Sequence, residues 1–184
     1  MVRRSWIFES GDSMTTGTVV IAAVAAACVM GVPMTASAGP PRSAVSAEAA
    51  SDADTQAVVE SLYRAFAAGD GATIGGLLAA DLVWVEAESG PYADRNPYTG
   101  PGAVFEGVFG RIGAAFDGFA ATPGTYLVSG DSVVAFGRYT GTNKATGEAL
   151  DAQFVHVFTV TGGKITHFQQ YTDTAQWVDV VTPD

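Results

Sequence analysis

Four long segments in the C-terminal half of the chain show the alternating apolar pattern of β-strands. They cover Phe119–Val128, Ser132–Thr142, Leu150–Val160 and Lys164–Thr172. A Ser-Gly-Asp turn, a loop containing Gly, Asn and Lys, and a Gly-Gly pair at 162–163 separate them. Connections this short join antiparallel neighbours, because parallel strands need a crossover of about a dozen residues or more. The pattern therefore predicts an antiparallel meander of four long strands.

The segment before these strands has helical periodicity. Val58, Leu62 and Phe66 recur at helical spacing, with Asp54 as the expected N-cap and Gly69 as the stop. After it we expect a short helix at 72–79, a strand at 82–86, a loop at 87–99 and a third helix behind Pro101. The part of the loop around 92–98 is a candidate lid. Residues 174–181 fit either a short closing helix or an extended edge.

This order of elements predicts an α+β fold. About three N-terminal helices should cover one face of a curved antiparallel sheet and enclose a cone-shaped cavity. The other face of the sheet is left without helices, and we therefore expect a homodimer.

The N-terminal residues predict a secretory signal peptide at 1–38. Arg3 and Arg4 precede an apolar run at 19–32, and the Ala-Ser-Ala sequence at 36–38 fits signal peptidase. The run is short for a membrane span, which needs about 20 apolar residues. We expect a secreted or extracytoplasmic protein with no stable membrane span after cleavage; an uncleaved N-terminal anchor is the alternative, and Met14 is an alternative start. Residues 39–53 should form a flexible linker and 54–184 the domain.

Charge and composition exclude several classes of partner. The net charge is −10, which makes non-specific binding to nucleic acid implausible. A single cysteine excludes an internal disulfide framework and a cysteine-based zinc ribbon. The glycines between 69 and 76 match neither a phosphate loop nor a dinucleotide fingerprint, so we expect no cofactor. A small apolar molecule is the expected partner.

Three motifs together resemble those of a known family. They are Asp-Leu-Val-Trp-Val-Glu at 81–86, Gly-Pro-Gly-Ala-Val at 100–104, and Gly-Lys-Ile at 163–165 followed by Gln-Gln-Tyr-Thr-Asp at 169–173. In order and spacing they resemble SnoaL-like proteins of the nuclear-transport-factor-2-like superfamily, over residues 56–178. The resemblance implies the cystatin-like α+β cone with a hydrophobic pocket. It also implies relatives that include ketosteroid isomerases, limonene-epoxide hydrolases and polyketide cyclases.

The resemblance also assigns roles to individual positions. Glu86 stands where ketosteroid isomerase has its carboxylate base, and Asp173 matches the catalytic aspartate of the hydrolase and of the cyclases. The isomerase's oxyanion-binding tyrosine falls at Leu62, with Tyr63 one residue out of phase. Its protonated acid falls near Val155. The sequence therefore keeps the base of the isomerase but not its oxyanion pair.

Three residues are the catalytic candidates. Strand alternation places Glu86 on the same face as Trp84, and burial there would raise its pKa and make it a general acid or base; the alternative is a solvated carboxylate. Asp173 would orient a water, a substrate hydroxyl or a histidine, or else cap the 174–181 segment. His156 would shuttle protons with Asp173 or Glu86, or else serve as a core or dimer-interface residue.

The expected substrate-binding residues are mostly aromatic. They are Trp84, Tyr139, Phe154, Gln169 and Tyr171. Arg138 and Tyr139 occupy opposite faces of one strand; Tyr139 would donate a hydrogen bond to a carbonyl if it faces inward. Two histidines with no third ligand do not predict a metal site.

These residues favour a cofactor-free acid–base enzyme, exported and acting on a small apolar carbonyl compound. Isomerisation, cyclisation and hydration all fit this chemistry. Two alternatives remain open from the sequence. The cavity could bind a small molecule without catalysis, or the domain could be a dimerisation scaffold with no ligand.

Overall fold

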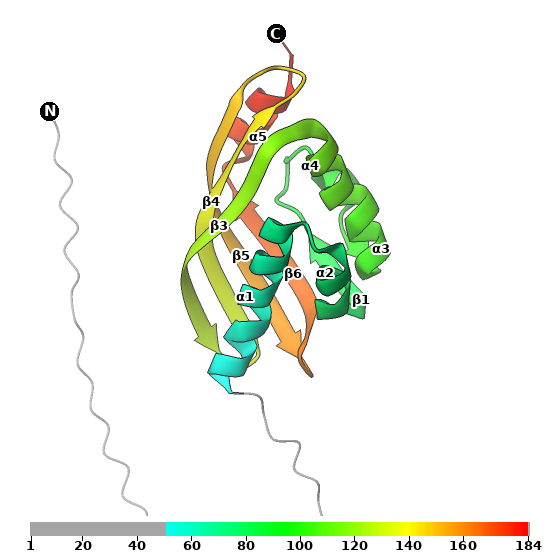
Figure 1. The fold of residues 1–184 in the computed structure, drawn as a ribbon, viewed down its shortest axis with the longest axis vertical. Coiled ribbons are helices and arrows are strands. Elements are labelled where there is room, and N and C mark those ends of the chain that lie inside the picture. The colour runs from blue at the N-terminus through cyan, green and yellow to red at the C-terminus, as the bar shows by residue number, and fades with distance from the viewer. Residues whose placement is uncertain (1–50, 184) are drawn as a thin grey trace, which may run out of the picture. The chain divides into compact units, whose positions relative to one another are not determined.

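The computed structural model describes residues 51–183 (Figure 1). Its elements are α1 (Asp52–Ala68), α2 (Gly71–Leu77), β1 (Leu78–Val85), the 3-10 turn η1 (Ala93–Arg95), β2 (Tyr98–Thr99), α3 (Gly100–Val104), the π-helical turn η2 (Phe105–Phe109), α4 (Gly110–Ala115), β3 (Phe116–Ser129), β4 (Ser132–Asn143), β5 (Ala149–Thr161), β6 (Lys164–Thr172) and α5 (Thr174–Val181). The expected signal peptide, and the expected linker up to residue 50, lie outside the described residues.

The strands form one sheet in the order β2-β1-β6-β5-β4-β3. The predicted meander is confirmed, because β3 to β6 pair antiparallel in succession. β1 differs from the expectation of a wholly antiparallel sheet: it runs parallel to β6, with Trp84 opposite Phe168. The whole meander separates these two strands in the sequence, so the connection is long enough for parallel pairing.

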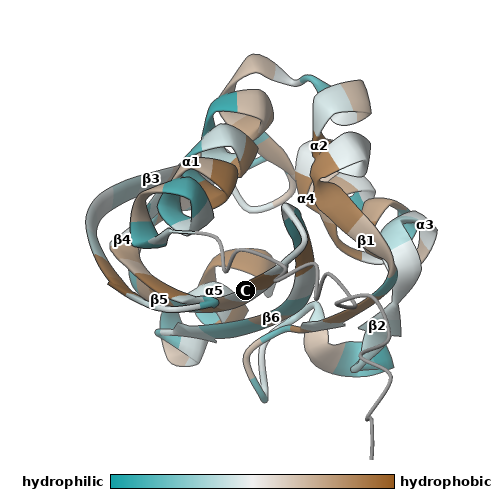
Figure 2. Ribbon diagram, turned by 90° about the horizontal axis from the view of Figure 1, so that it is seen from below, coloured by the Kyte–Doolittle hydropathy of each residue, from teal (hydrophilic) through white to brown (hydrophobic). Residues whose placement is uncertain are grey.

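The sheet curves around the helices, as the sequence predicts. In Figure 2 it runs from β3 and β4 through β5 and β6 to β1, and α1, α2 and α4 lie across its concave side. Register shifts interrupt β3 between Asp117 and Ala120 and again between Pro123 and Thr125. Bulges of this kind bend a strand, which helps a long antiparallel sheet to curl into a cone.

The N-cap of helix α1 lies three residues before the expected one. Ser51 caps it in a capping box with Asp54, in which each side chain pairs with the other residue's backbone N–H. Asp54 is therefore the third residue of the helix, at position N3, and not the cap. Gly69 ends the helix in the left-handed conformation, with φ of 67°, as expected.

The remaining helices close the domain. The third predicted helix is present as α3, η2 and α4 in continuous sequence, and it buries the apolar residues Val104, Val108 and Ile112. The C-terminal segment forms the helix α5 and not an edge strand, because Trp177 and Val180 bury one side of it. Within residues 51–183, no helix combines the length and the apolar character that a membrane crossing requires.

Candidate functional site

A cavity of about 50 Å³ lies between α1, the η2–α4 helix and the concave side of the sheet. Its walls are largely aromatic and include Phe66, Trp84, Phe109, Phe119, Phe158 and Phe168. Five polar side chains also line it: Tyr63, Glu86, Tyr139, His156 and Gln170. A lining that is largely apolar, with a few convergent polar groups, is typical of small-molecule sites.

Glu86 lies inside this cavity, directly after β1. Its side chain is 3% exposed and lies on the same side as Trp84, because strand side chains alternate. The Trp84 indole Nε1 donates a hydrogen bond of 2.6 Å to Glu86 Oε1. The Trp84 ring is itself fixed by stacking on Phe168, at 3.6 Å between ring centroids. The expected inward placement of both residues is confirmed.

Burial changes the ionisation of Glu86. Loss of solvation raises the pKa of its carboxyl to about 7, against the opposing effect of hydrogen bonds from Trp84 and Gln170. A carboxyl with this pKa is about half ionised at neutral pH, so it can both accept and return a proton.

Asn96 holds the backbone of Glu86 from the loop that follows β1. The Glu86 N–H donates to Asn96 Oδ1 at 2.9 Å, and Asn96 Nδ2 donates to the Glu86 carbonyl at 2.8 Å. The same loop is tied to α4, where Arg111 Nη1 donates to Asp94 Oδ1 at 2.7 Å. The loop expected as a lid is thus anchored at two points, and one of them positions Glu86.

His156 lies between two tyrosines from different elements. Its Nδ1 is 2.8 Å from the hydroxyl of Tyr63 on α1, and its Nε2 is 2.5 Å from the hydroxyl of Tyr139 on β4. Phe154 stacks on the imidazole at 4.0 Å between centroids. Burial lowers the pKa of His156 to about 3 and raises the pKa values of both phenols. All three side chains are therefore neutral at physiological pH.

Gln170 connects this group of rings to the β1 end. Its Nε2 donates to the Tyr139 hydroxyl at 2.8 Å, and its Oε1 accepts from the backbone N–H of Ala87 at 3.1 Å. Sequence reasoning missed Gln170 and chose its neighbour Gln169. The error lies in which of the alternating side chains of β6 face the cavity.

Four predicted site residues do not line the cavity: Phe154, which is buried beside it, and three residues at or after the end of β6. Gln169 and Tyr171 face the other side of β6, where Tyr171 is 57% exposed, and Asp173 directly follows the strand. The cavity face predicted from the sequence is counted from Asp173, whereas the structure sets this face through a register shift early in β6, which pairs Val160 with Ile165 but Thr159 with His167. The extra residue lets both Ile165 and Phe168 point inward, so the residues after them alternate in the opposite phase.

Asp173 has the structural role that the sequence left as its alternative. Its Oδ1 accepts from the backbone N–H of Gln176 at 3.2 Å and so caps α5. The pairing of His156 with Asp173 or Glu86, expected for a proton shuttle, is absent among the described residues, because both ring nitrogens face tyrosine hydroxyls.

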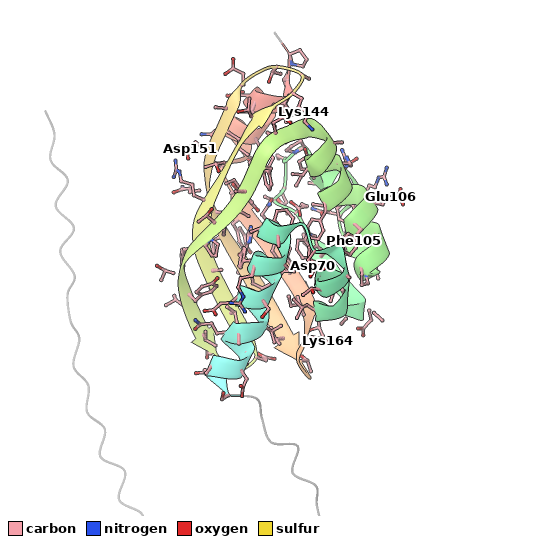
Figure 3. All side chains as sticks on the ribbon, in the orientation of Figure 1. Asp70, Phe105, Glu106, Lys144, Asp151 and Lys164 are labelled. Carbon is pink, nitrogen blue, oxygen red and sulfur yellow. The ribbon has the colours of Figure 1, made fainter. Side chains whose placement is uncertain are left out.

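The ambiguity between Arg138 and Tyr139 is resolved. Tyr139 faces the cavity, whereas Arg138 is on the outer side, where its guanidinium pairs with Asp151 and donates to the Asp151 carbonyl at 2.8 Å. Asp151, Lys144 and Glu106 all lie at the periphery of the domain in Figure 3. Phe154 is buried beneath His156 and supports it without lining the cavity.

Tyr63 reaches the cavity although the resemblance placed the tyrosine position at Leu62. It lies four residues after Val59 and three before Phe66, so it belongs to the inward face of α1. That spacing was the signal that could have identified it. No three His, Cys, Asp or Glu side chains in the described part of the chain gather closely enough to hold a metal ion.

Residues 59–168 match the family model of the SnoaL-like domain. The chain belongs to the SnoaL-like family. A nuclear-transport-factor-2-like protein from Burkholderia thailandensis is 32% identical to this SnoaL-like chain; the match covers 71% of this chain and 98% of that one, with a TM-score of 0.66. No curated protein matches the sequence.

Two solved structures of candidate polyketide cyclases share the fold of this SnoaL-like protein. A SnoaL-like one from a Jannaschia species is 17% identical over 72% of this chain and 94% of its own, with a TM-score of 0.60. Wild-type IdmH from Streptomyces antibioticus is 22% identical over 69% and 97%, with a TM-score of 0.59. These likenesses confirm the α+β cone that the motifs imply.

Proposed function

We propose that this SnoaL-like protein is a cofactor-free acid–base enzyme that acts on a small, neutral, apolar carbonyl compound. One observation carries the proposal: the buried carboxyl of Glu86, with a pKa near 7, shares an aromatic cavity with neutral phenol donors. No lysine or arginine is among the residues that line the cavity. An anionic substrate would therefore meet only the negative charge of Glu86.

The proposed reaction begins with proton removal. The Glu86 carboxylate takes a proton from the carbon next to the substrate carbonyl, and the electron pair moves to the carbonyl oxygen. A phenol of Tyr63 or Tyr139 donates a hydrogen bond to this enolate oxygen, which lowers the cost of the developing charge. In a β,γ-unsaturated substrate the electron pair is shared with the neighbouring double bond, and protonated Glu86 returns the proton to the γ-carbon, which completes an isomerisation.

Cyclisation and hydration use the same groups. In cyclisation the enolate carbon attacks a second carbonyl, and Glu86 gives its proton to the alkoxide that forms. In hydration Glu86 takes a proton from a water that adds to a conjugated double bond, and returns it to the α-carbon. The two candidate polyketide cyclases with this fold support a substrate that contains several carbonyls.

The test compares the same substitution at a buried and at an exposed glutamate. Glu86 is buried in the cavity, and Glu88 is exposed two residues later. Thermal unfolding with a panel of ketones, lactones, epoxides and steroids identifies compounds that bind, because a ligand of the folded state raises the melting temperature. For such a compound, Glu86→Gln should retain binding and lose about 10²- to 10⁴-fold in turnover, whereas Glu88→Gln should change neither.

A non-catalytic binding module is the second candidate. It is favoured by the position of Asp173, because the second carboxylate expected in the site lies outside the cavity. In that case compounds would bind, none would be converted, and Glu86→Gln would change affinity only slightly. A scaffold domain would show no compound that binds, and Glu86→Gln would alter stability alone.

We also propose that the protein forms a homodimer through the outer face of the sheet. Phe136, Val155 and Tyr171 lie in one cross-strand row on β4, β5 and β6, and Phe136 and Tyr171 are 39% and 57% exposed. Sedimentation at micromolar concentration should show a dimer that Phe136→Asp dissociates. A monomeric wild-type chain would contradict this assembly.

Export is proposed from the N-terminal sequence. Expression of the full chain should yield extracytoplasmic protein whose N-terminus, read by sequencing, is Gly39. Protein retained in the cytoplasm would contradict export, and an exported protein with an intact N-terminus would indicate the uncleaved anchor.

A further inference from the structure

Tyr63, His156 and Tyr139 form a chain with two hydrogen bonds, at 2.8 Å and 2.5 Å. Neutral imidazole carries one N–H, and each phenol carries one O–H. The chain therefore holds three donor protons, and its two links use only two of them. Among the described residues, the Tyr63 hydroxyl has His156 as its one partner. One phenol proton is thus always left over, on a ring that lines the cavity.

The position of that proton depends on the tautomer of His156. When Nδ1 carries the hydrogen, it donates to the Tyr63 oxygen, and Tyr139 donates to Nε2. The Tyr63 O–H is then free to point into the cavity. The Tyr139 hydroxyl then has no free proton, because it donates to His156, and its oxygen also accepts from Gln170 Nε2.

The other tautomer reverses the roles of the two tyrosines. When Nε2 carries the hydrogen, it donates to the Tyr139 oxygen, and Tyr63 donates to Nδ1. The Tyr139 O–H is then the free one, while its oxygen accepts from both His156 and Gln170. Both arrangements contain the same three hydrogen bonds, namely Tyr63–His156, His156–Tyr139 and Gln170–Tyr139. The hydrogen-bonded network itself therefore does not strongly prefer either tautomer.

We propose that His156 is a positioning residue whose tautomer selects which of Tyr63 and Tyr139 donates a hydrogen bond into the cavity. This inference rests on the proposed function in one respect, since it takes the cavity as the place where a carbonyl oxygen binds. A carbonyl beside one phenol draws the imidazole to the tautomer that frees that phenol. The cavity can thus serve a carbonyl at either of two positions, with one donor at a time.

Exchange between the tautomers conserves protons. One proton leaves the free phenol for the cavity, two move along the internal hydrogen bonds, and one enters at the other phenol. Water or the carboxyl of Glu86, which lines the same cavity, carries the proton between the two ends. The total on the three side chains stays at three.

Nitrogen-15 NMR of the imidazole tests the proposal without any substrate. The chain has two histidines, so His167→Gln in the full-length protein leaves His156 as the one source of imidazole signals. In this background Tyr63→Phe removes the partner of Nδ1 and should place the hydrogen on Nε2, because an unpaired buried donor is costly. Tyr139→Phe removes the partner of Nε2 and should place the hydrogen on Nδ1.

Opposite tautomers in the two phenylalanine variants are the expected result. The same tautomer in both, or an imidazolium at neutral pH, would overturn the proposal. If a variant does not fold, the chain with only His167→Gln supplies a second test: both nitrogen shifts should lie between their limiting values and move in opposite directions with temperature. Two shifts fixed at the limits would overturn the proposal. These readouts hold whether or not the protein turns over a substrate, so they are independent of the proposed reaction.

Discussion

Trp84 on β1 and Glu86, which directly follows β1, point to the same side, and their side chains form a buried hydrogen bond of 2.6 Å. The alternation of β1 brings the two side chains together, and the stack of Trp84 on Phe168 fixes the donor. The bond favours the charged form of a carboxyl that burial disfavours. The balance of these two effects sets the proton affinity of the candidate base.

Removal of this donor should raise the pKa of Glu86 further. Trp84→Phe keeps an aromatic ring in the cavity wall but deletes the N–H that stabilises the carboxylate. Carbon-13 NMR of the glutamate carboxyls across a pH range would measure the change. An unaltered or lower pKa in Trp84→Phe would show that the indole does not stabilise the charged form.

Glu86 should make the protein less stable as pH rises. Its pKa is raised from 4.5 to about 7, so the folded state binds more protons than the unfolded state between these values. Its contribution is fully present below pH 4.5 and is lost as pH rises through 7, a difference of about 3 kcal/mol. Glu86→Gln should therefore exceed the wild type in stability by up to that amount at pH 8.5, and should match it near pH 4.5.

Urea unfolding at these two pH values is the measurement, with Glu88→Gln as the control. The control should follow the wild type at both, because Glu88 is exposed. A Glu86→Gln variant that is no more stable than the wild type at pH 8.5 would argue against a buried ionising carboxyl.

Asn96 should prove important although it does not line the cavity. Asn96→Ala deletes both hydrogen bonds to the Glu86 backbone. Each partly buried backbone group left without its partner should lower the free energy of unfolding by at most about 1–3 kcal/mol. Lower stability and a displaced Glu86 carboxyl titration are expected. Unfolding and carboxyl NMR unchanged from the wild type would mean that the loop does not position the base.

Substitutions at Gln170 and Gln169 test which side chains of β6 face the cavity. Gln170→Met removes a buried side chain that joins Tyr139 to the Ala87 N–H, and should cost about 1–3 kcal/mol. Gln169→Met lies on the other face and should change stability by about 0.5 kcal/mol or less. Equal effects in urea unfolding would contradict the assigned register.

The sequence was informative where the alternation is regular. The meander, the curved sheet and the inward placement of Trp84 and Glu86 follow from period-two patterns flanked by apolar residues. In β6 the apolar residues Ile165 and Phe168 are three positions apart, and a bulge is needed to bury both. The resemblance placed Asp173 in the site, and alternation counted back from Asp173 added Gln169 and Tyr171, so Gln170 was missed.

The histidine cluster could not be derived from local patterns. Tyr63 is 93 positions from His156, and the hydrogen bond between them depends on how α1 packs against the sheet. Helical spacing predicts that Tyr63 is buried, and strand alternation predicts that one of Arg138 and Tyr139 faces inward. Neither pattern shows that both phenols meet the same imidazole.

A pH titration of the glutamate carboxyls by carbon-13 NMR tests the central claim most directly, since the claim is that Glu86 ionises near neutrality inside the cavity. The wild-type protein should show one glutamate carboxyl with a pKa of about 7, and Glu86→Gln should lack that resonance while the others are unchanged. A wild-type spectrum in which every glutamate titrates near its ordinary value would contradict the assignment of Glu86 as the acid–base group.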